Sequence, residues 1–203
     1  MKDKAEMYLM RHGHTVLDLE HRSDGWLDLP LSDNGQLSVI PAQQELKDVP
    51  LRKIFTPDLK RTQETACIME SGILSDPKVI VVPEARTWNL GVIAGTQKRY
   101  GRPEVQKLID NPDRAPEGGE SYNNFRDRFL PWLDKQLAKA SPSAPVLFVG
   151  SGSNLRLIGQ ALLGDIDALD LDEGGLAYLY SVNDGQWKHE IVLGEDDLQT
   201  EIS

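Results

Sequence analysis

The sequence predicts a single α/β domain: a three-layer sandwich with a mostly parallel central sheet, helices on both faces and an antiparallel edge. Short apolar runs alternate along the chain with segments of helical periodicity, which is typical of this class. Two further runs near the C-terminus flank residues 183 to 185, Asn-Asp-Gly, a hairpin signal. The chain has 203 residues, so we expect one domain over its whole length, with an acidic tail from about residue 195.

Four short apolar runs are predicted strands, and at least three of them are candidates for the parallel sheet: residues 7 to 10, 53 to 55, 78 to 82 and 146 to 149. The first ends at Arg11-His12-Gly13, and the second runs into Thr56-Pro57-Asp58. Thr56 is expected to cap a helix that has Pro57 in its first position. This helix would carry Arg61 in its first turns.

The helical segments show apolar residues at helical spacing. One spans residues 121 to 139, where Pro131 is expected to kink or split the helix. Another follows the polar segment 150 to 154, Gly-Ser-Gly-Ser-Asn. Strands over residues 177 to 182 and 187 to 193 then form the predicted antiparallel edge.

Composition excludes several classes of protein. Lys and Arg number 22 against 32 Asp and Glu, a formal charge of −10, which disfavours nucleic acid and anionic membranes as partners. The single cysteine, Cys67, cannot form an internal disulfide and fits a reducing compartment. The charged start of the chain does not resemble a signal peptide, and no apolar run is long enough to span a membrane. We therefore expect a cytoplasmic protein.

Three polar segments follow predicted parallel strands and should meet at one edge of the sheet. Arg11-His12-Gly13, Arg61 and residues 150 to 154 would then combine two arginines, a histidine and a glycine-rich loop, which suits a phosphate group. Taken singly, each arginine is also typical of a surface ion pair, and the glycine-rich segment of a tight strand-to-helix turn. That segment lacks the Gly-Lys-Ser/Thr ending of a P-loop.

These residues also belong to a longer ordered set. Arg11-His12-Gly13 is followed by Arg22, by residues 25 to 32 (Gly-Trp-Leu-Asp-Leu-Pro-Leu-Ser), by residues 58 to 66 around Arg61, and by residues 116 to 121 (Pro-Glu-Gly-Gly-Glu-Ser). In this order they resemble the motifs of the histidine phosphatase superfamily, the phosphoglycerate-mutase-like proteins with the Arg-His-Gly motif. The resemblance covers about residues 7 to 165.

The resemblance implies a phosphohistidine mechanism without metal or cofactor. His12 would attack phosphorus, while Arg11 and Arg61 would hold the non-bridging oxygens. Arg22 matches a position that contacts phosphate or orients the pocket. The remaining residues expected to bind phosphate or substrate are His14, Thr87, Ser151 and Gly152.

Several positions depart from the family pattern. Ser151 stands where the family has its second histidine, and Thr87 stands where the general acid would fall. Ala94 replaces a glutamate usual before the next glycine, and Asp18 replaces a frequent asparagine, which adds negative charge near the pocket. Losing an acid–base group costs about 10²–10⁴-fold in rate, and losing an electrostatic donor about 10²–10³-fold.

Two functional hypotheses follow. In the first, the chain is a pseudoenzyme that binds phosphate or a small phosphorylated molecule, with weak or lost phosphatase activity. In the alternative, it is an active phosphohydrolase with His12 as nucleophile and a substitute acid, for which His14, Glu84 and Glu120 are the candidates, or a substrate with a good leaving group. A third interpretation makes Ser151 an introduced substitution for a natural histidine. A homodimer is compatible with the sequence, which leaves the oligomeric state and the natural ligand open.

Overall fold

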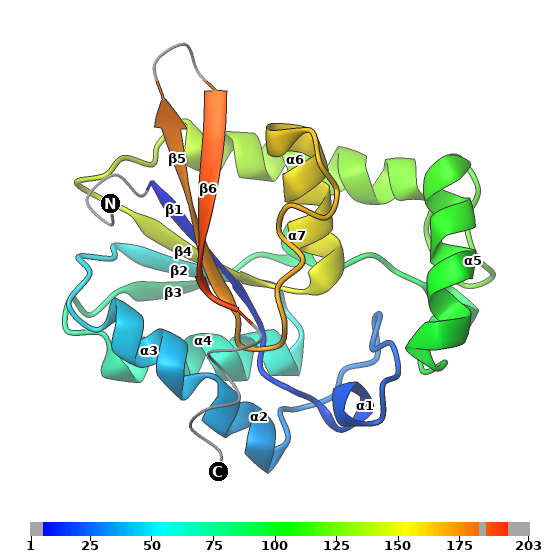
Figure 1. The fold of residues 1–203 in the computed structure, drawn as a ribbon, viewed down its shortest axis with the longest axis horizontal. Coiled ribbons are helices and arrows are strands. Elements are labelled where there is room, and N and C mark those ends of the chain that lie inside the picture. Colours follow the sequence, from blue (N-terminus) through cyan, green and yellow to red (C-terminus); the bar gives the residue numbers. More distant parts are fainter. Residues whose placement is uncertain (1–5, 183–185, 195–203) are drawn as a thin grey trace.

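The computed structural model describes residues 6 to 182 and 186 to 194 and has a six-stranded sheet at its centre (Figure 1). The strand order is β3-β2-β4-β1-β5-β6. The strands are β1 (Met7–Arg11), β2 (Lys53–Thr56), β3 (Lys78–Val81), β4 (Val146–Gly150), β5 (Leu176–Val182) and β6 (Gln186–Leu193). β1 to β4 pair in parallel, and β5 and β6 form an antiparallel edge beside β1. The predicted fold class is confirmed.

Helices cover both faces of this sheet, with α3 and α4 on one side and α6 and α7 on the other (Figure 1). The longer helices are α4 (Lys60–Gly72), α5 (Lys98–Asp110) and α6 (Tyr122–Leu137). The shorter ones are α1 (Val16–Leu19), α2 (Asp33–Ser38), α3 (Ile40–Leu46), α7 (Gly152–Ile158) and the turns η2 (Pro83–Ala85), η3 (Gly91–Ile93) and η4 (Gly159–Leu163). Among the described residues, none of the helices has the length and apolar character needed to cross a membrane.

The strands are apolar throughout because each buries side chains on both faces. In β1, Met7 and Leu9 belong to the core under α6 and α7, whereas Tyr8 and Met10 belong to the core under α3 and α4. All four side chains are almost fully buried. This two-sided burial turns the usual alternating strand pattern into a continuous apolar run.

Helix α6 begins at the expected place, but Pro131 does not split it. Ser121 is the cap, because its hydroxyl accepts a hydrogen bond from the Asn124 backbone N–H at 3.1 Å. Pro131 removes the helical partner of the Asp127 carbonyl, and Asp127 lies on the exposed face, where solvent can satisfy that carbonyl. Of the two expected effects of Pro131, a kink or a split, the split is therefore wrong.

The cap predicted for the helix that carries Arg61 was also wrong. Thr56 is the last residue of β2, and α4 begins only at Lys60. The first N–H group of α4 is satisfied from a distant loop, because Lys60 N–H donates to Asp28 Oδ1 at 2.7 Å. Arg61 still lies in the first turn, as predicted.

Helix α5 was not predicted. The expected turn at residues 183 to 185 and the acidic tail from residue 195 lie outside the described residues.

Candidate active site

The site lies where β1 and β4 end side by side. Arg11 is the register partner of Gly150, and the His12 backbone N–H donates to the Gly150 carbonyl at 3.0 Å. The loop after β1 packs against α2 without room for a side chain, since a Cβ on Gly35 would lie 1.9 Å from the His14 carbonyl oxygen. The polar segments after the two strands therefore converge, as the sequence predicts.

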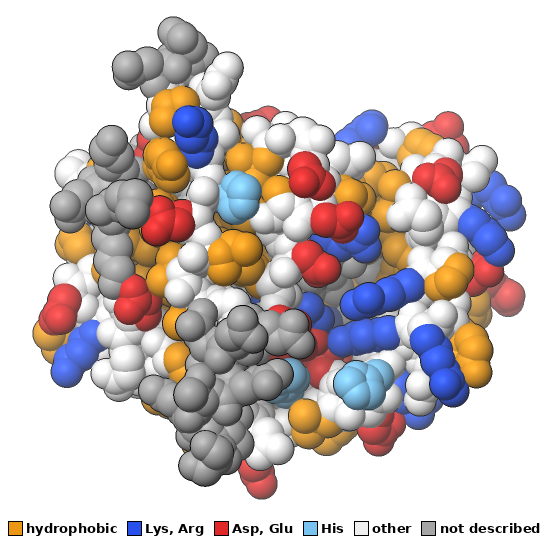
Figure 2. All heavy atoms as spheres, in the orientation of Figure 1, with side chains coloured by type: hydrophobic (Ala, Val, Ile, Leu, Met, Phe, Trp, Pro, Cys, Tyr) orange, Lys and Arg blue, Asp and Glu red, His pale blue; other side chains and the backbone are white. Residues whose placement is uncertain are grey.

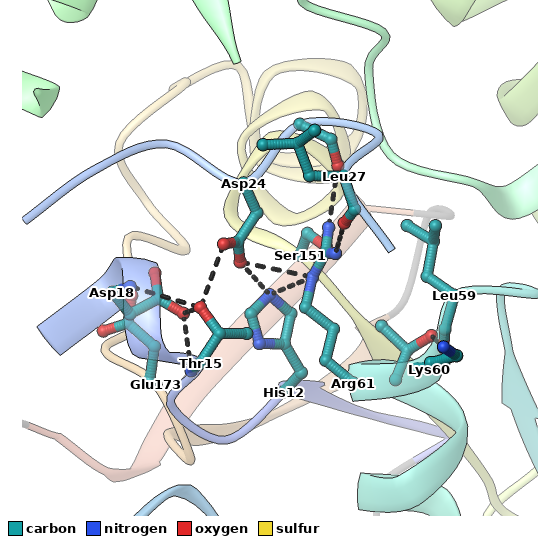
Figure 3. Close-up of polar contacts among 12 residues, drawn as sticks. His12, Thr15, Asp18, Asp24, Leu27, Leu59, Lys60, Arg61, Ser151 and Glu173 are labelled. Atoms are coloured by element: carbon teal, nitrogen blue, oxygen red, sulfur yellow. Dashed lines mark hydrogen bonds and ion pairs between the residues drawn. The ribbon is translucent and has the colours of Figure 1, made fainter. Parts of the chain in front are cut away.

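His12 is buried, neutral and oriented by two hydrogen bonds, and Figure 3 shows its contact with Arg61. Its Nδ1–H donates to the Gly13 carbonyl at 2.8 Å, and its Nε2 accepts from Arg61 Nε–H at 3.1 Å. Burial, together with the charge of Arg61, lowers the pKa of His12 from 6.5 to about 3. At neutral pH, Nε2 therefore carries a lone pair, as a nucleophile needs, but this lone pair accepts the Arg61 hydrogen bond and must be released from it before attack.

The guanidinium group of Arg61 is fixed by backbone carbonyls. Its two terminal nitrogens donate to Gly25 O and Leu27 O, each at 2.8 Å, and the side chain is 1% exposed. This leaves the Nε edge facing His12. Arg11 is held in a different way, by the Leu171 carbonyl at 2.7 Å and by Glu173.

Asp24 lies directly beside the nucleophile and was not singled out in the sequence. Its Oδ2 is 3.4 Å from Arg61 Nε and 4.0 Å from His12 Nε2, while its Oδ1 accepts from Thr15 Oγ1 at 2.9 Å. Burial raises the pKa of Asp24 from 3.8 to about 6, against the attraction of Arg61. Its charge therefore changes close to neutral pH.

A second cluster of charges lies next to this one. Lys98 Nζ, from α5, bridges Asp18 Oδ1 and Glu173 Oε1, both at 3.1 Å. Three cations (Arg11, Arg61 and Lys98) and two carboxyl groups (Asp18 and Asp24) line the pocket, and a third carboxyl group, that of Glu173, pairs with Arg11 and Lys98 beside it. Acidic and basic side chains are likewise interspersed on the face shown in Figure 2.

The cavity at this point has a volume of about 120 Å³. Of the residues expected to bind the ligand, Thr87, Ser151 and Gly152 line it, together with Arg11, His12 and Arg61. The Thr87 carbonyl accepts from Trp26 Nε1 at 2.7 Å, which helps to fix this segment. Ser151 Oγ is buried and has no hydrogen-bond partner within the described part of the chain.

Two expected residues do not line the cavity. Arg22 donates to the Gly95 carbonyl and pairs with Glu20, and His14 lies with its Nδ1 3.8 Å from Glu173. The other proposed substitute acids are also elsewhere. Glu84 is exposed in η2, and Glu120 accepts hydrogen bonds from Arg128 and from the Asn89 backbone.

The residues that sequence reasoning missed are Asp24, Lys98 and Glu173. Asp24 directly precedes the Gly25-Trp26 segment, so its place beside a recognised motif was a usable signal. Lys98 and Glu173 come from segments far apart in the chain and carry no such signal, because only the tertiary fold brings them together.

His12, Asp18 and Asp24 also have the spacing of a metal site, since one potential ligand atom from each lies within 4.8 Å of the others. However, the Nε2 lone pair of His12 already accepts a hydrogen bond from Arg61. Lys98 pairs with Asp18, and Arg11 lines the same cavity. His12 and Asp18 are thus already engaged by cationic side chains of the protein, which opposes a divalent ion at this place.

Comparison with known proteins agrees with this geometry. The family model described as the histidine phosphatase superfamily (branch 1) matches residues 7 to 190. The chain belongs to the histidine phosphatase superfamily. The resemblance noted in the sequence is thereby confirmed.

Relatives within the superfamily include both mutases and phosphatases. The chain is 27% identical to a 2,3-bisphosphoglycerate-dependent phosphoglycerate mutase 2 of Gloeobacter violaceus, over 83% of this chain and 78% of the relative. It is 29% identical to a metal-independent phosphoserine phosphatase of Arabidopsis thaliana, over 76% of this chain and 67% of the relative. A mycobacterial glucosyl-3-phosphoglycerate phosphatase has the same fold, with a TM-score of 0.76, 21% identity and coverage of 94% of this chain and 99% of its own.

Proposed function

We propose that this protein binds the phosphoryl group of a small phosphorylated molecule in the pocket around His12, and that its phosphatase activity is weak or lost. The observation that carries the proposal is the lining of the cavity. The nucleophile and both arginines are present, whereas Thr87 and Ser151 line the cavity at the positions where the family pattern has an acid and a second histidine.

The binding half of the proposal rests on donors directed into the cavity. Arg11 Nε and Ser151 Oγ are both buried without a hydrogen-bond partner among the described residues, and both side chains line the cavity. Buried polar groups are usually satisfied, so an orphaned hydroxyl favours a polar ligand at this place. The cavity of about 120 Å³ suits a small tetrahedral anion.

The weak-catalysis half rests on the direction of phosphoryl transfer. In an in-line reaction, His12 Nε2 bonds to phosphorus while the bond from phosphorus to the leaving oxygen breaks on the far side, and that oxygen must gain a proton. The attacking and attacked atoms start about 3–3.5 Å apart, so the leaving oxygen lies beyond the phosphorus. Asp24 Oδ2 lies 4.0 Å from Nε2 and 3.4 Å from Arg61 Nε, so in the proposed complex it lies beside a non-bridging oxygen and not beside the leaving oxygen. Thr87 is too weak an acid to donate this proton.

A second candidate function, a phosphohydrolase for substrates with good leaving groups, is favoured by the intact neutral imidazole of His12. Acyl phosphates and other phosphoanhydrides need little help from an acid. Their reaction would form phosphohistidine at Nε2, and water would then release inorganic phosphate.

A substrate panel separates the two functions. Purified protein and the His12→Ala variant are incubated with alkyl phosphomonoesters and with acetyl phosphate, and phosphate release is measured. We expect no His12-dependent turnover of the alkyl esters. Turnover of an alkyl ester at an ordinary enzymatic rate of about 1–10³ s⁻¹, abolished in the variant, would overturn the proposal. Turnover of acetyl phosphate alone, with acid-labile labelling of His12, would support the second function.

A further inference from the structure

The position of Asp24 has a consequence for what the pocket can bind. A phosphorus atom ready for attack lies about 3–3.5 Å from the nucleophile, surrounded by its non-bridging oxygens. Asp24 Oδ2 is 4.0 Å from His12 Nε2 and 3.4 Å from Arg61 Nε. An oxygen of Asp24 therefore already occupies the neighbourhood in which an oxygen of the anion would lie.

Asp24 cannot easily move away from this position. Its other oxygen accepts a hydrogen bond from Thr15 Oγ1, and Thr15 is itself fully buried at the start of α1. The Asp24 side chain is 6% exposed. A carboxylate oxygen and a phosphate oxygen at hydrogen-bond distance repel each other unless a proton lies between them.

The charges around Asp24 make this proton decisive. The charged and titratable groups near it come from every adjoining element: Arg11 and His12 at the end of β1, Asp18 of α1, Arg61 of α4, Lys98 of α5 and Glu173 before β5. With Asp24 ionised, three carboxylates oppose three cations. With Asp24 protonated, the pocket has an excess of one positive charge.

We propose that the pocket binds an oxyanion only together with one proton, shared between Asp24 and an oxygen of the anion. This inference rests on the proposed function and specifies its ligand. The preferred ligand class is a phosphate or phosphomonoester in its singly protonated form, which can bring the proton itself. Sulfate carries no proton near neutral pH. Its binding therefore requires that Asp24 take up a proton from solvent.

Sulfate is therefore the sharper probe, because its own charge is constant between pH 5 and pH 8 while a phosphomonoester titrates near pH 6. The pKa of Asp24, raised to about 6, makes the protonated fraction of the carboxyl fall about 90-fold between these two pH values. His12, with its pKa lowered to about 3, stays neutral over the whole range. His12 therefore does not contribute to the pH dependence of sulfate affinity.

The test is isothermal titration of the full chain with sulfate and with inorganic phosphate, from pH 5 to pH 8. Wild-type protein should lose about 90-fold in sulfate affinity over this range. At pH 7, in two buffers of different ionisation enthalpy, it should take up close to one proton per sulfate bound. Inorganic phosphate should bind more tightly than sulfate at pH 7.

The Asp24→Asn variant should bind sulfate with little dependence on pH, take up no proton, and lose the preference for phosphate. Asp134→Asn, at an exposed position of α6, is the matched control and should behave as wild type. Should Asp24→Asn fail to fold, proton uptake by the wild-type protein still decides the question.

The outcomes separate the two proposals. Anion binding without proton uptake and without a change in affinity over pH would refute the role of Asp24 and leave the binding function standing. No binding of either anion by wild type or variant at any pH would refute the proposed function itself.

Discussion

Replacing Asp24 by Asn removes a partner of Arg61, but the stability of the variant relative to wild type should rise as the pH rises from acid to alkaline. Burial raises the pKa of this carboxyl from 3.8 in the unfolded chain to about 6 in the fold. The folded state therefore holds the proton more tightly than the unfolded state. Wild-type stability contributed by this group is fully present below the unfolded pKa and is lost as pH rises through about 6.

The magnitude follows from the two pKa values. A difference of about two units corresponds to about 3 kcal/mol of stability lost by the wild type at pH 8, and about 1 kcal/mol at pH 4.5. Asn keeps an oxygen acceptor for Thr15 and does not titrate. The pH-dependent part of the stability difference should therefore favour the variant by about 2 kcal/mol more at pH 8 than at pH 4.5.

Urea unfolding followed by fluorescence, at pH 4.5, 6 and 8, measures this difference for wild type and Asp24→Asn. The exposed Asp134→Asn variant is the control, since surface substitutions usually change stability by no more than about 0.5 kcal/mol. If the variant's stability relative to wild type stays constant across the three pH values, or rises toward acid pH, the Asp24 carboxyl does not have the raised pKa assigned to it.

Further predictions concern the same region. His12→Asn removes an imidazole whose pKa is lowered from 6.5 to about 3. As the pH falls from 7.5 to 4, the free energy of unfolding of wild type should decrease by about 3 kcal/mol more than that of the variant. Urea unfolding that gives the same pH dependence for the two proteins would contradict this. Arg61→Met leaves a buried carboxyl without its cation and should cost about 3–5 kcal/mol at pH 7.5, measured in the same way, whereas a loss below about 1 kcal/mol would argue against a buried pair. Gly35→Ala places a Cβ 1.9 Å from the backbone oxygen of His14 and should cost at least about 2 kcal/mol in thermal or urea unfolding. Its control, Gly152→Ala, meets nothing closer than 3.7 Å and should change stability little; equal costs for the two would show that the close packing at Gly35 is not rigid.

Much of the fold could be predicted because its signals are local. A continuous apolar run marks a strand buried on both faces, and the pairing of β1 with β4 follows the parallel arrangement expected of such runs. The cap of α4 could not be predicted from neighbouring residues, because Asp28 supplies it from another loop. The sequence did not show whether Pro131 would split α6, because the effect of a proline depends on whether the carbonyl that it leaves without a helical partner, here that of Asp127, is exposed to solvent.

The fold class, the family and the convergence of Arg11, His12 and Arg61 could be predicted from the chain alone, since each depends on residue order along strands and their following loops. Which charges share the pocket depends on how remote segments pack in the folded molecule. The tertiary structure places Asp24 beside His12, brings Lys98 to Glu173 across 75 residues of chain and leaves Arg22 outside the cavity lining. The physical reason is that charge balance and pKa values depend on burial and on distances of a few ångströms between segments remote in sequence.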